Sequence, residues 1–168
     1  EAGEDNTIVM DTDTETASTK PVTIAILDTG YTGDSDRILK GINTVDDEQR
    51  NTEDDNGHGT RMAEIVTSMT NDNVNIMPIK VANKDGFATI TSTYAGILYA
   101  IEKDVDIINI SMNARVSENS FLLADAIKQA TDAGIKVIVS AGNRSMDVAK
   151  ITPSNIPEAI VVSSVDVN

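Results

Sequence analysis

Five short apolar runs, separated by patterns typical of helices, limit most strongly what this chain can fold into. The runs are rich in Ile and Val, as in strands that are buried on both faces. Such runs fall at residues 22–27, 76–81, 105–111, 135–140 and 159–165. Each has the length of a strand and is too short for a typical helix.

The segments between these runs carry apolar residues at helical spacing. The three faces are Met62, Ile65, Val66 and Met69; Tyr94, Ile97, Leu98 and Ile101; and Leu123, Ala124, Ile127 and Ala130. Gly134 then ends the third helix. Because strands alternate with helices, the sequence predicts an α/β fold, with a parallel sheet, right-handed crossovers and helices on both faces.

Length and composition favour one domain. The chain has 168 residues, of which 40% are hydrophobic, enough for a single core. Residues 1–20 are acidic and rich in threonine and are predicted to form an amino-terminal arm, whereas residues 21–168 form the domain. The acidic stretch 46–55 is interpreted as a solvated surface connection.

Charge and residue usage exclude several classes of function. Acidic residues outnumber basic ones 27 to 13, for a net charge of -14, so a nucleic-acid partner is not expected. The absence of cysteine excludes disulfides, thiolate metal sites and cysteine nucleophiles. No apolar stretch approaches the roughly 20 residues that a membrane-spanning helix needs.

Polar residues stand where predicted strands end. Asp28, Ser111 and Asn143 follow three different apolar runs, and the carboxyl ends of parallel strands meet at one edge of a sheet. His58, the only histidine, lies between two glycines at the start of a helical pattern. Together, an acid, an imidazole and an amide are three parts of an acyl-transfer site.

Each of these residues also has an interpretation without acyl transfer. Asp28 is compatible with a simple turn, or with a phosphoacceptor or magnesium ligand in a doubly wound domain, and the segment 11–14 resembles part of an acid-pair phosphatase motif. His58 alone is compatible with a structural role, and Asn143 with a strand-to-loop turn. The phosphoacceptor hypothesis gives His58 and Asn143 no role.

Four motifs, in this order, resemble those of the subtilisin-like serine peptidases, the subtilase family. They are Asp28-Thr29-Gly30, His58-Gly59-Thr60-Arg61-Met62-Ala63, Asn109-Ile110-Ser111-Met112 and Ala141-Gly142-Asn143. The resemblance continues through residues 153–162 and covers the chain from Val22 onward. It implies a subtilisin-like three-layer fold and a serine endopeptidase that acts on polypeptide substrates.

The resemblance also implies roles for individual residues. Asp28 would orient and stabilise His58, which would act as general base and then general acid, and the side-chain amide of Asn143 would bind the oxyanion. The walls of the pocket for the residue before the scissile bond would be Ser111, Met112, Asn113, Ser140 and Gly142.

The chain departs from the family pattern at several positions. Arg61 and Glu64 stand where the family usually has histidine and glycine, and Asn113-Ala114 stands where it commonly has two glycines. The segment 70–78 is short compared with the calcium-binding loop of many relatives, so no metal ligands are assigned. No cofactor is expected, and calcium binding is left open. The segment around Ser92 resembles the serine motif of the family only superficially, and Ser92 is predicted to cap a helix.

The largest departure concerns the nucleophile. The family's serine lies in Gly-Thr-Ser-Met-Ala on a later helix, and residues 1–168 contain no such motif. The sequence is therefore interpreted as the amino-terminal two thirds of a peptidase domain, truncated before the nucleophile helix and inactive alone. The missing carboxyl-terminal segment or a propeptide is the expected partner, and the family's habit predicts a secreted or cell-surface location. The alternative is a pseudo-protease that uses the fold for binding.

Overall fold

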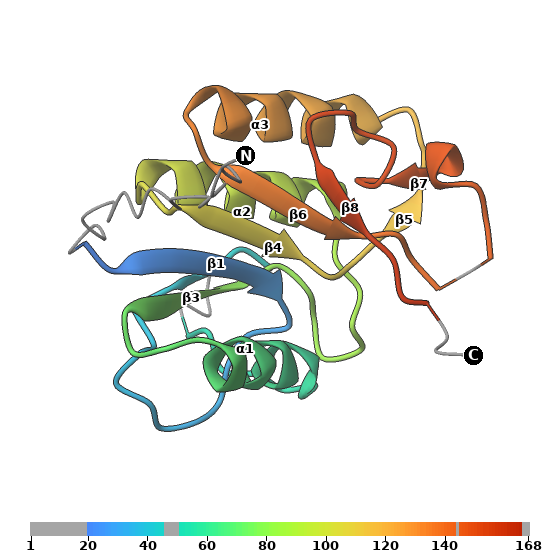
Figure 1. The fold of residues 1–168 in the computed structure, drawn as a ribbon. Helices are drawn as coiled ribbons and strands as arrows, with labels where there is room; N and C mark the ends of the chain where they lie inside the picture. The colour runs from blue at the N-terminus through green and yellow to red at the C-terminus, as the bar shows by residue number, and fades with distance from the viewer. Residues whose placement is uncertain (1–19, 46–50, 144, 166–168) are drawn as a thin grey trace, which may run out of the picture.

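The computed structural model describes residues 20–45, 51–143 and 145–165, so almost all of the predicted arm lies outside the described residues. Six strands form one parallel sheet in the order β2-β3-β1-β4-β6-β8 (Figure 1). Their bounds are β1 Val22–Asp28, β2 Ile42–Asn43, β3 Val74–Lys80, β4 Ile107–Ile110, β6 Lys136–Ser140 and β8 Ile160–Val162. The five predicted strands are therefore present, and the α/β prediction is confirmed. A separate antiparallel pair joins β5 Ala114–Arg115 and β7 Ile151–Thr152.

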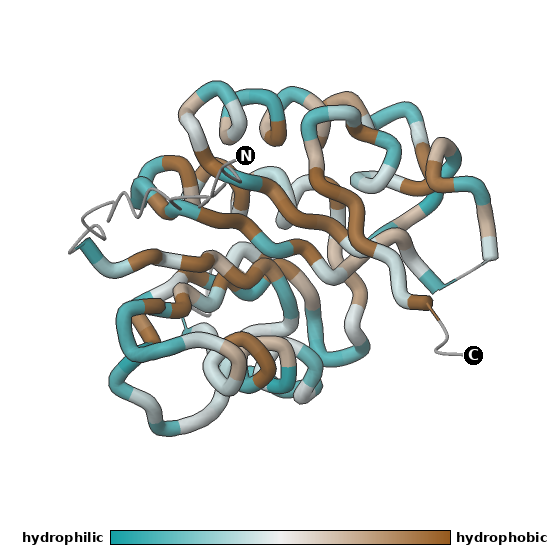
Figure 2. Tube along the Cα trace, viewed as in Figure 1, coloured by the Kyte–Doolittle hydropathy of each residue, from teal (hydrophilic) through white to brown (hydrophobic). Residues whose placement is uncertain are grey.

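Within the described residues, three helices cover the sheet from two sides. Helix α1 spans His58–Met69, α2 spans Ile90–Glu102 and α3 spans Ser120–Asp132, and a short 3-10 helix spans Val148–Lys150. Figure 1 shows α1 on one side of the sheet and α2 and α3 on the other. The main core lies between the sheet and α2 and α3, where Leu27, Ile97 and Ile127 are fully buried. The hydrophobic colouring of the central strands in Figure 2 follows from this position between two layers.

The predicted apolar face of α1 is partly wrong. Met62 and Val66 pack against Ile26, but Ile65 is 46% exposed and Met69 is 81% exposed. Among the described strands α1 contacts chiefly β1 and β3, and a helix on a narrow strip of sheet buries a narrow stripe. Its buried residues are Gly59 and Ala63, which set the phase of that stripe.

The predicted cap of α2 is displaced by three residues. Thr89 is the N-cap, and its hydroxyl accepts a hydrogen bond from the Ser92 backbone N–H at 2.9 Å. The Ser92 hydroxyl in turn accepts from the Thr89 N–H at 3.0 Å, which completes a reciprocal capping box. Ser92 therefore helps to cap the helix from its third position rather than as the N-cap.

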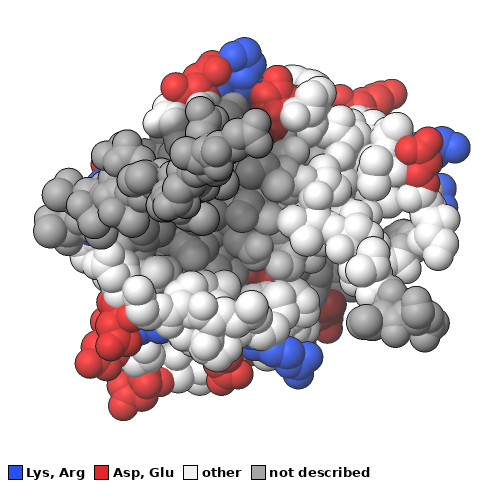
Figure 3. All heavy atoms as spheres, viewed as in Figure 1, with Lys and Arg blue, Asp and Glu red and all other residues white. Residues whose placement is uncertain are grey.

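Part of the sheet has no helix over it among the described residues. On β4, β6 and β8 the residues that point away from α2 and α3 alternate with the buried core residues. They include Ile107 and Ile138, which are partly buried, and Ile160 and Val162, which are 50% and 55% exposed. We call these four residues the uncovered sheet face. In the view of Figure 3 the described atoms near β8 are mostly neither acidic nor basic.

Candidate active site

The site is centred on a hydrogen bond between a carboxylate at the end of β1 and an imidazole at the start of α1. Asp28 is the last residue of β1 and is fully buried, and His58 is the first residue of α1. The His58 Nδ1 lies 2.7 Å from the Asp28 Oδ1. Because a carboxylate can only accept, Nδ1 carries the proton of this bond, and the lone pair of Nε2 is left for another group.

Thr29 fixes both partners of this pair. Its backbone N–H donates to the Asp28 Oδ1 at 2.7 Å, and its hydroxyl accepts from the backbone N–H of Gly59 at 2.9 Å. Thr29 therefore links the turn after Asp28 to Gly59, the residue that follows His58. Gly59 also has no room for a side chain, since a Cβ there would meet the Gly30 carbonyl oxygen and lie 3.2 Å from the Asp28 Cβ.

Asp54 holds the first turn of α1 from outside the helix. Its Oδ1 accepts from the Gly57 N–H at 2.8 Å, and its Oδ2 accepts from the Thr60 N–H at 2.9 Å and the Thr60 hydroxyl at 2.6 Å. The N-cap residue Gly57 makes no side-chain cap, so this carboxylate takes that role and also complements the helix dipole.

The same contacts set the ionisation of Asp54. Burial by itself would raise the pKa of the carboxyl, but the hydrogen bonds from Thr60 and Gly57 outweigh burial and hold the pKa well below its ordinary value of 3.8. The acidic stretch 46–55 is therefore more than a solvated connection in its described part, because Asp54 organises the helix that carries His58.

Lys80 ties the acidic stretch to the turn that follows Asp28. It is the last residue of β3 and is only 5% exposed. Its Nζ donates to the Thr29 carbonyl oxygen and to the Asp55 Oδ1, each at 2.6 Å. A lysine so deeply buried needs such partners, because an unpaired ammonium inside a protein is costly.

A pocket of about 310 Å³ opens beside the imidazole. Its lining brings together residues from the ends of several elements: Thr29, Asn56, His58, Ser111, Met112, Asn113 and Asn143. Ser111 follows β4 directly and Asn143 lies three residues after β6, so the parallel topology brings them to one edge.

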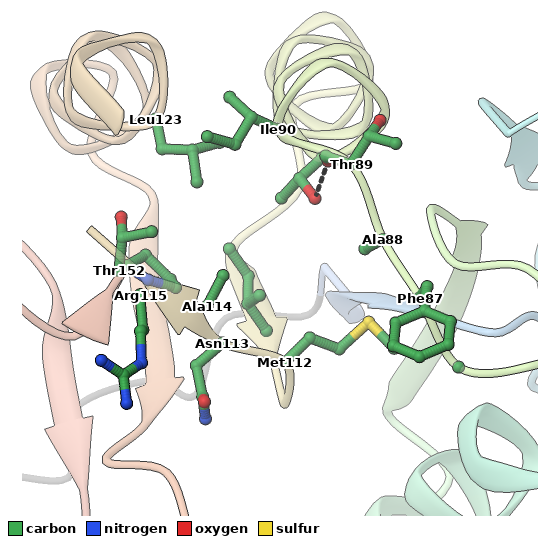
Figure 4. A pocket seen from close by; sticks show the side chains of 14 residues that line it. Phe87, Ala88, Thr89, Ile90, Met112, Asn113, Ala114, Arg115, Leu123 and Thr152 are labelled. Carbon is green, nitrogen blue, oxygen red and sulfur yellow. Dashed lines mark hydrogen bonds between the residues drawn. The ribbon is translucent and has the colours of Figure 1, made fainter. Parts of the chain in front are cut away.

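A second pocket, of about 220 Å³, adjoins the first and shares Met112 and Asn113 with it. Figure 4 shows Leu123 and Ile90 on one side and Met112 with Phe87 on another. Phe87 is 74% exposed, which is unusual for a side chain of its size. We call these two adjoining pockets the cleft; the first is lined by His58, and the second, toward α2 and α3, is more apolar.

The predicted site residues thus converge in space. Asp28 contacts His58, and His58 and Asn143 line one pocket with Ser111, Met112 and Asn113. The two predicted walls also meet directly, because the Asn113 Nδ2 donates to the Ser140 Oγ at 3.2 Å. Gly142 has a φ of 87° and lies against the Asn113 side chain.

Thr29, Asp54 and Lys80 support the site but were not predicted from the sequence. Lys80 carried a usable signal, since it is the one charged residue in the predicted strand 76–81. Asp54 carried a weaker signal, an acid four residues before a histidine that opens a helix. Neither the sequence motifs nor the helical periodicity identifies the contacts that these side chains make.

Among the described residues, no group of three or more His, Cys, Asp or Glu side chains converges in a way that would hold a metal ion. No described helix is long and apolar enough to cross a membrane.

This fold and this acid–imidazole pair are features of a known class of proteins, the subtilases. The model of the subtilase family matches residues 19–168, and the chain belongs to that family. This confirms the family that the four motifs indicated.

The chain is similar to several peptidases. It is 32% identical over 160 residues to subtilisin DY of Bacillus licheniformis, which covers 88% of this chain and 57% of that protein. It is 38% identical over 137 residues to an intracellular serine protease of Paenibacillus polymyxa, covering 73% of this chain and 41% of the relative. A cold-adapted subtilisin-like serine proteinase has the same fold, with a TM-score of 0.73 and 24% identity over 83% of this chain and 53% of the other. The chain thus spans about half the length of these relatives.

Proposed function

We propose that this chain supplies the acid, the base and the oxyanion donor of a serine endopeptidase whose nucleophile lies on polypeptide beyond Asn168. The observation that carries the proposal is the 2.7 Å contact between Asp28 and His58 at the mouth of a pocket that Asn143 also lines. Subtilisin DY and the Paenibacillus polymyxa protease, both related to this chain, support the reaction class.

In the proposed reaction the serine Oγ attacks the carbonyl carbon of the peptide bond and the His58 Nε2 takes the serine proton. The oxygen of the tetrahedral intermediate then accepts a hydrogen bond from the Asn143 amide. His58 passes the proton to the leaving amine, and an ester between serine and substrate remains. Water, activated by His58, hydrolyses the ester and restores the serine.

Asp28 has two tasks in this scheme. Its hydrogen bond fixes the ring of His58 with Nε2 toward the pocket, and its negative charge stabilises the imidazolium that forms when the serine is deprotonated. Its complete burial strengthens this interaction, since water does not screen the carboxylate.

The uncovered sheet face supports the view that further polypeptide completes the domain. Ile160 and Val162 expose apolar surface beside the rim that carries the site, and folded domains bury such surface when they can. A segment that covers this face would also approach the His58 pocket from the side of α1. By the proposal, residues 1–168 alone do not hydrolyse peptides.

Secretion is the location that we propose from the resemblance. The Paenibacillus polymyxa relative is an intracellular protease, so membership of the family alone does not fix the compartment.

A fluorophosphonate probe tests the proposal, because it labels an activated serine. We expect the full-length protein to be labelled, the full-length His58→Ala variant to be labelled far more slowly, and residues 1–168 to remain unlabelled. A full-length protein that binds peptides but is never labelled would instead support a pseudo-protease.

A further inference from the structure

A side chain crosses the cleft between the two predicted walls of the substrate pocket. The Asn113 Nδ2, from the segment after β4, donates to the Ser140 Oγ at the end of β6 at 3.2 Å. Strands β4 and β6 are neighbours in the sheet, and the Asn113 carboxamide therefore bridges the segments at their carboxyl ends.

The backbone of the opposite wall is shaped around this carboxamide. A Cβ at Gly142 would lie 2.9 Å from the Asn113 Nδ2 and 3.2 Å from both its Cγ and its Oδ1. Gly142 also has a φ of 87°, which side chains rarely tolerate. The carboxamide therefore packs against the backbone of Gly142, and a side chain at position 142 would displace it.

Asn113 also stands between the two pockets of the cleft. It lines both the pocket beside His58 and the more apolar pocket next to it. Figure 4 shows its carboxamide directed away from Leu123 and Ile90, out of the apolar pocket. Its polar end is thus directed to the wall formed by β6 and the segment after it.

We propose that Asn113 is a specificity-determining residue, which limits the substrate side chain before the scissile bond to that of glycine or alanine. The inference rests on the proposed function in that the cleft binds a polypeptide. A larger side chain entering between Ser111-Met112 and Ser140-Gly142 must break the bond to Ser140 and move the carboxamide off Gly142. A methyl group or a hydrogen atom leaves both contacts intact.

The test uses the full-length protein labelled with ¹⁵N and two peptides, N-acetyl-Ala-Ala-Ala and N-acetyl-Ala-Ala-Leu. Titration followed at the Gly142 and Asn143 amides gives the ratio of the two dissociation constants without any need for chemistry. Asn113→Ala removes the carboxamide, and Ser140→Ala removes only its acceptor. Asn119→Ala is the control, because Asn119 is exposed and its side chain makes no cap at α3.

We expect wild type to bind the alanine peptide more tightly. Asn113→Ala should shift the ratio of the two dissociation constants toward the leucine peptide by about tenfold or more, because added methylenes change binding in a pocket on that scale. Ser140→Ala should shift it in the same direction by less, and Asn119→Ala should leave it unchanged. If Asn113→Ala does not fold, the shift of the ratio in Ser140→Ala tests the role of the bond between Asn113 and Ser140.

An equal ratio in wild type and both cleft variants would overturn the inference, as would the absence of any perturbation at Gly142. Fluorophosphonate labelling of the same samples reports on the nucleophile alone. A labelled protein with an unchanged ratio therefore refutes the specificity role, whereas an unlabelled protein with the expected shift refutes catalysis and supports the role of Asn113 in peptide selection.

Discussion

Lys80 and Asp28 occupy paired positions on the neighbouring strands β3 and β1, yet the lysine Nζ donates to the Thr29 carbonyl oxygen and to the Asp55 Oδ1. The Asp28 Oδ1 instead accepts from His58 and from the Thr29 N–H. The lysine thus holds the turn that follows Asp28, while the Asp28 carboxylate pairs with the imidazole.

Replacing Asp28 by asparagine in the full-length protein should abolish most of the activity. Asparagine keeps the shape but removes the charge, and it can present an amide N–H to Nδ1, which favours the wrong tautomer of His58. We expect kcat to fall by about 10⁴-fold, the scale seen when the acid of a Ser-His-Asp triad is changed in this way. Peptide hydrolysis measures the effect, and an unchanged circular dichroism spectrum serves as the control. A loss of less than tenfold would contradict the role of Asp28.

Lys80→Met should destabilise the protein and loosen the turn that follows Asp28. It leaves the Thr29 carbonyl without its donor, and an unsatisfied buried polar group costs about 1–3 kcal/mol. Chemical denaturation measures the free energy of unfolding. The matched control is Lys128→Met, which breaks an exposed ion pair with Asp132 at 2.7 Å and should cost clearly less. Equal losses in the two variants would show that the contacts of Lys80 with Thr29 and Asp55 add nothing.

Asp54→Asn should change the response of the protein to acid. The pKa of Asp54 in the folded protein lies below the ordinary value of 3.8, so ionised Asp54 stabilises the fold above that pH. This stability is lost as the pH falls from about 4 through the lower pKa of the folded state. The free energy of unfolding of wild type should therefore drop more steeply below pH 4 than that of Asp54→Asn.

The control for this experiment is Asp36→Asn, which removes the same charge from an exposed position. Its stability should follow wild type more closely across the acid range than that of Asp54→Asn. Parallel curves for wild type and Asp54→Asn would contradict the role assigned to the bonds with Thr60 and Gly57.

Gly59→Ala should reduce both stability and activity. Alanine is the better helix former by about 1 kcal/mol, but its Cβ would press on the Gly30 carbonyl and the Asp28 side chain, and overpacking costs about 1–3 kcal/mol. The start of α1 must then shift, and His58 shifts with it. The comparison is Gly134→Ala, where nothing lies within 4 Å, so only backbone strain is added and kcat should not change. Full activity in Gly59→Ala would contradict this account.

The sequence predicted the regular alternation of strands and helices. Apolar runs in the sequence predicted strands β1, β3, β4, β6 and β8. The parallel topology then predicted that Asp28, Ser111 and Asn143 lie at one edge of the sheet. Strands β2, β5 and β7 were missed because two residues carry no periodicity.

Contacts made by long polar side chains could not be predicted. The bonds of Lys80 and Asp54 depend on how the acidic stretch returns to the sheet, which no local pattern encodes. The exposure of Ile65 and Met69 has a similar origin, since the rotation of α1 is set by the close approach of Gly59 to Gly30. The bond of Asn113 to Ser140 depends on a side-chain rotamer, which no sequence pattern encodes.

The uncovered sheet face has a practical consequence for anyone who prepares this protein. Strand β8 is the last in the sheet order, and its residues Ile160, Val161 and Val162 are 50%, 39% and 55% exposed. An edge strand with unpaired backbone groups and branched apolar side chains is a template for another chain. Preparations in which nothing covers this face are therefore expected to form oligomers through β8, and Val162→Lys, which places a charge on that face, should keep them monomeric in size-exclusion chromatography.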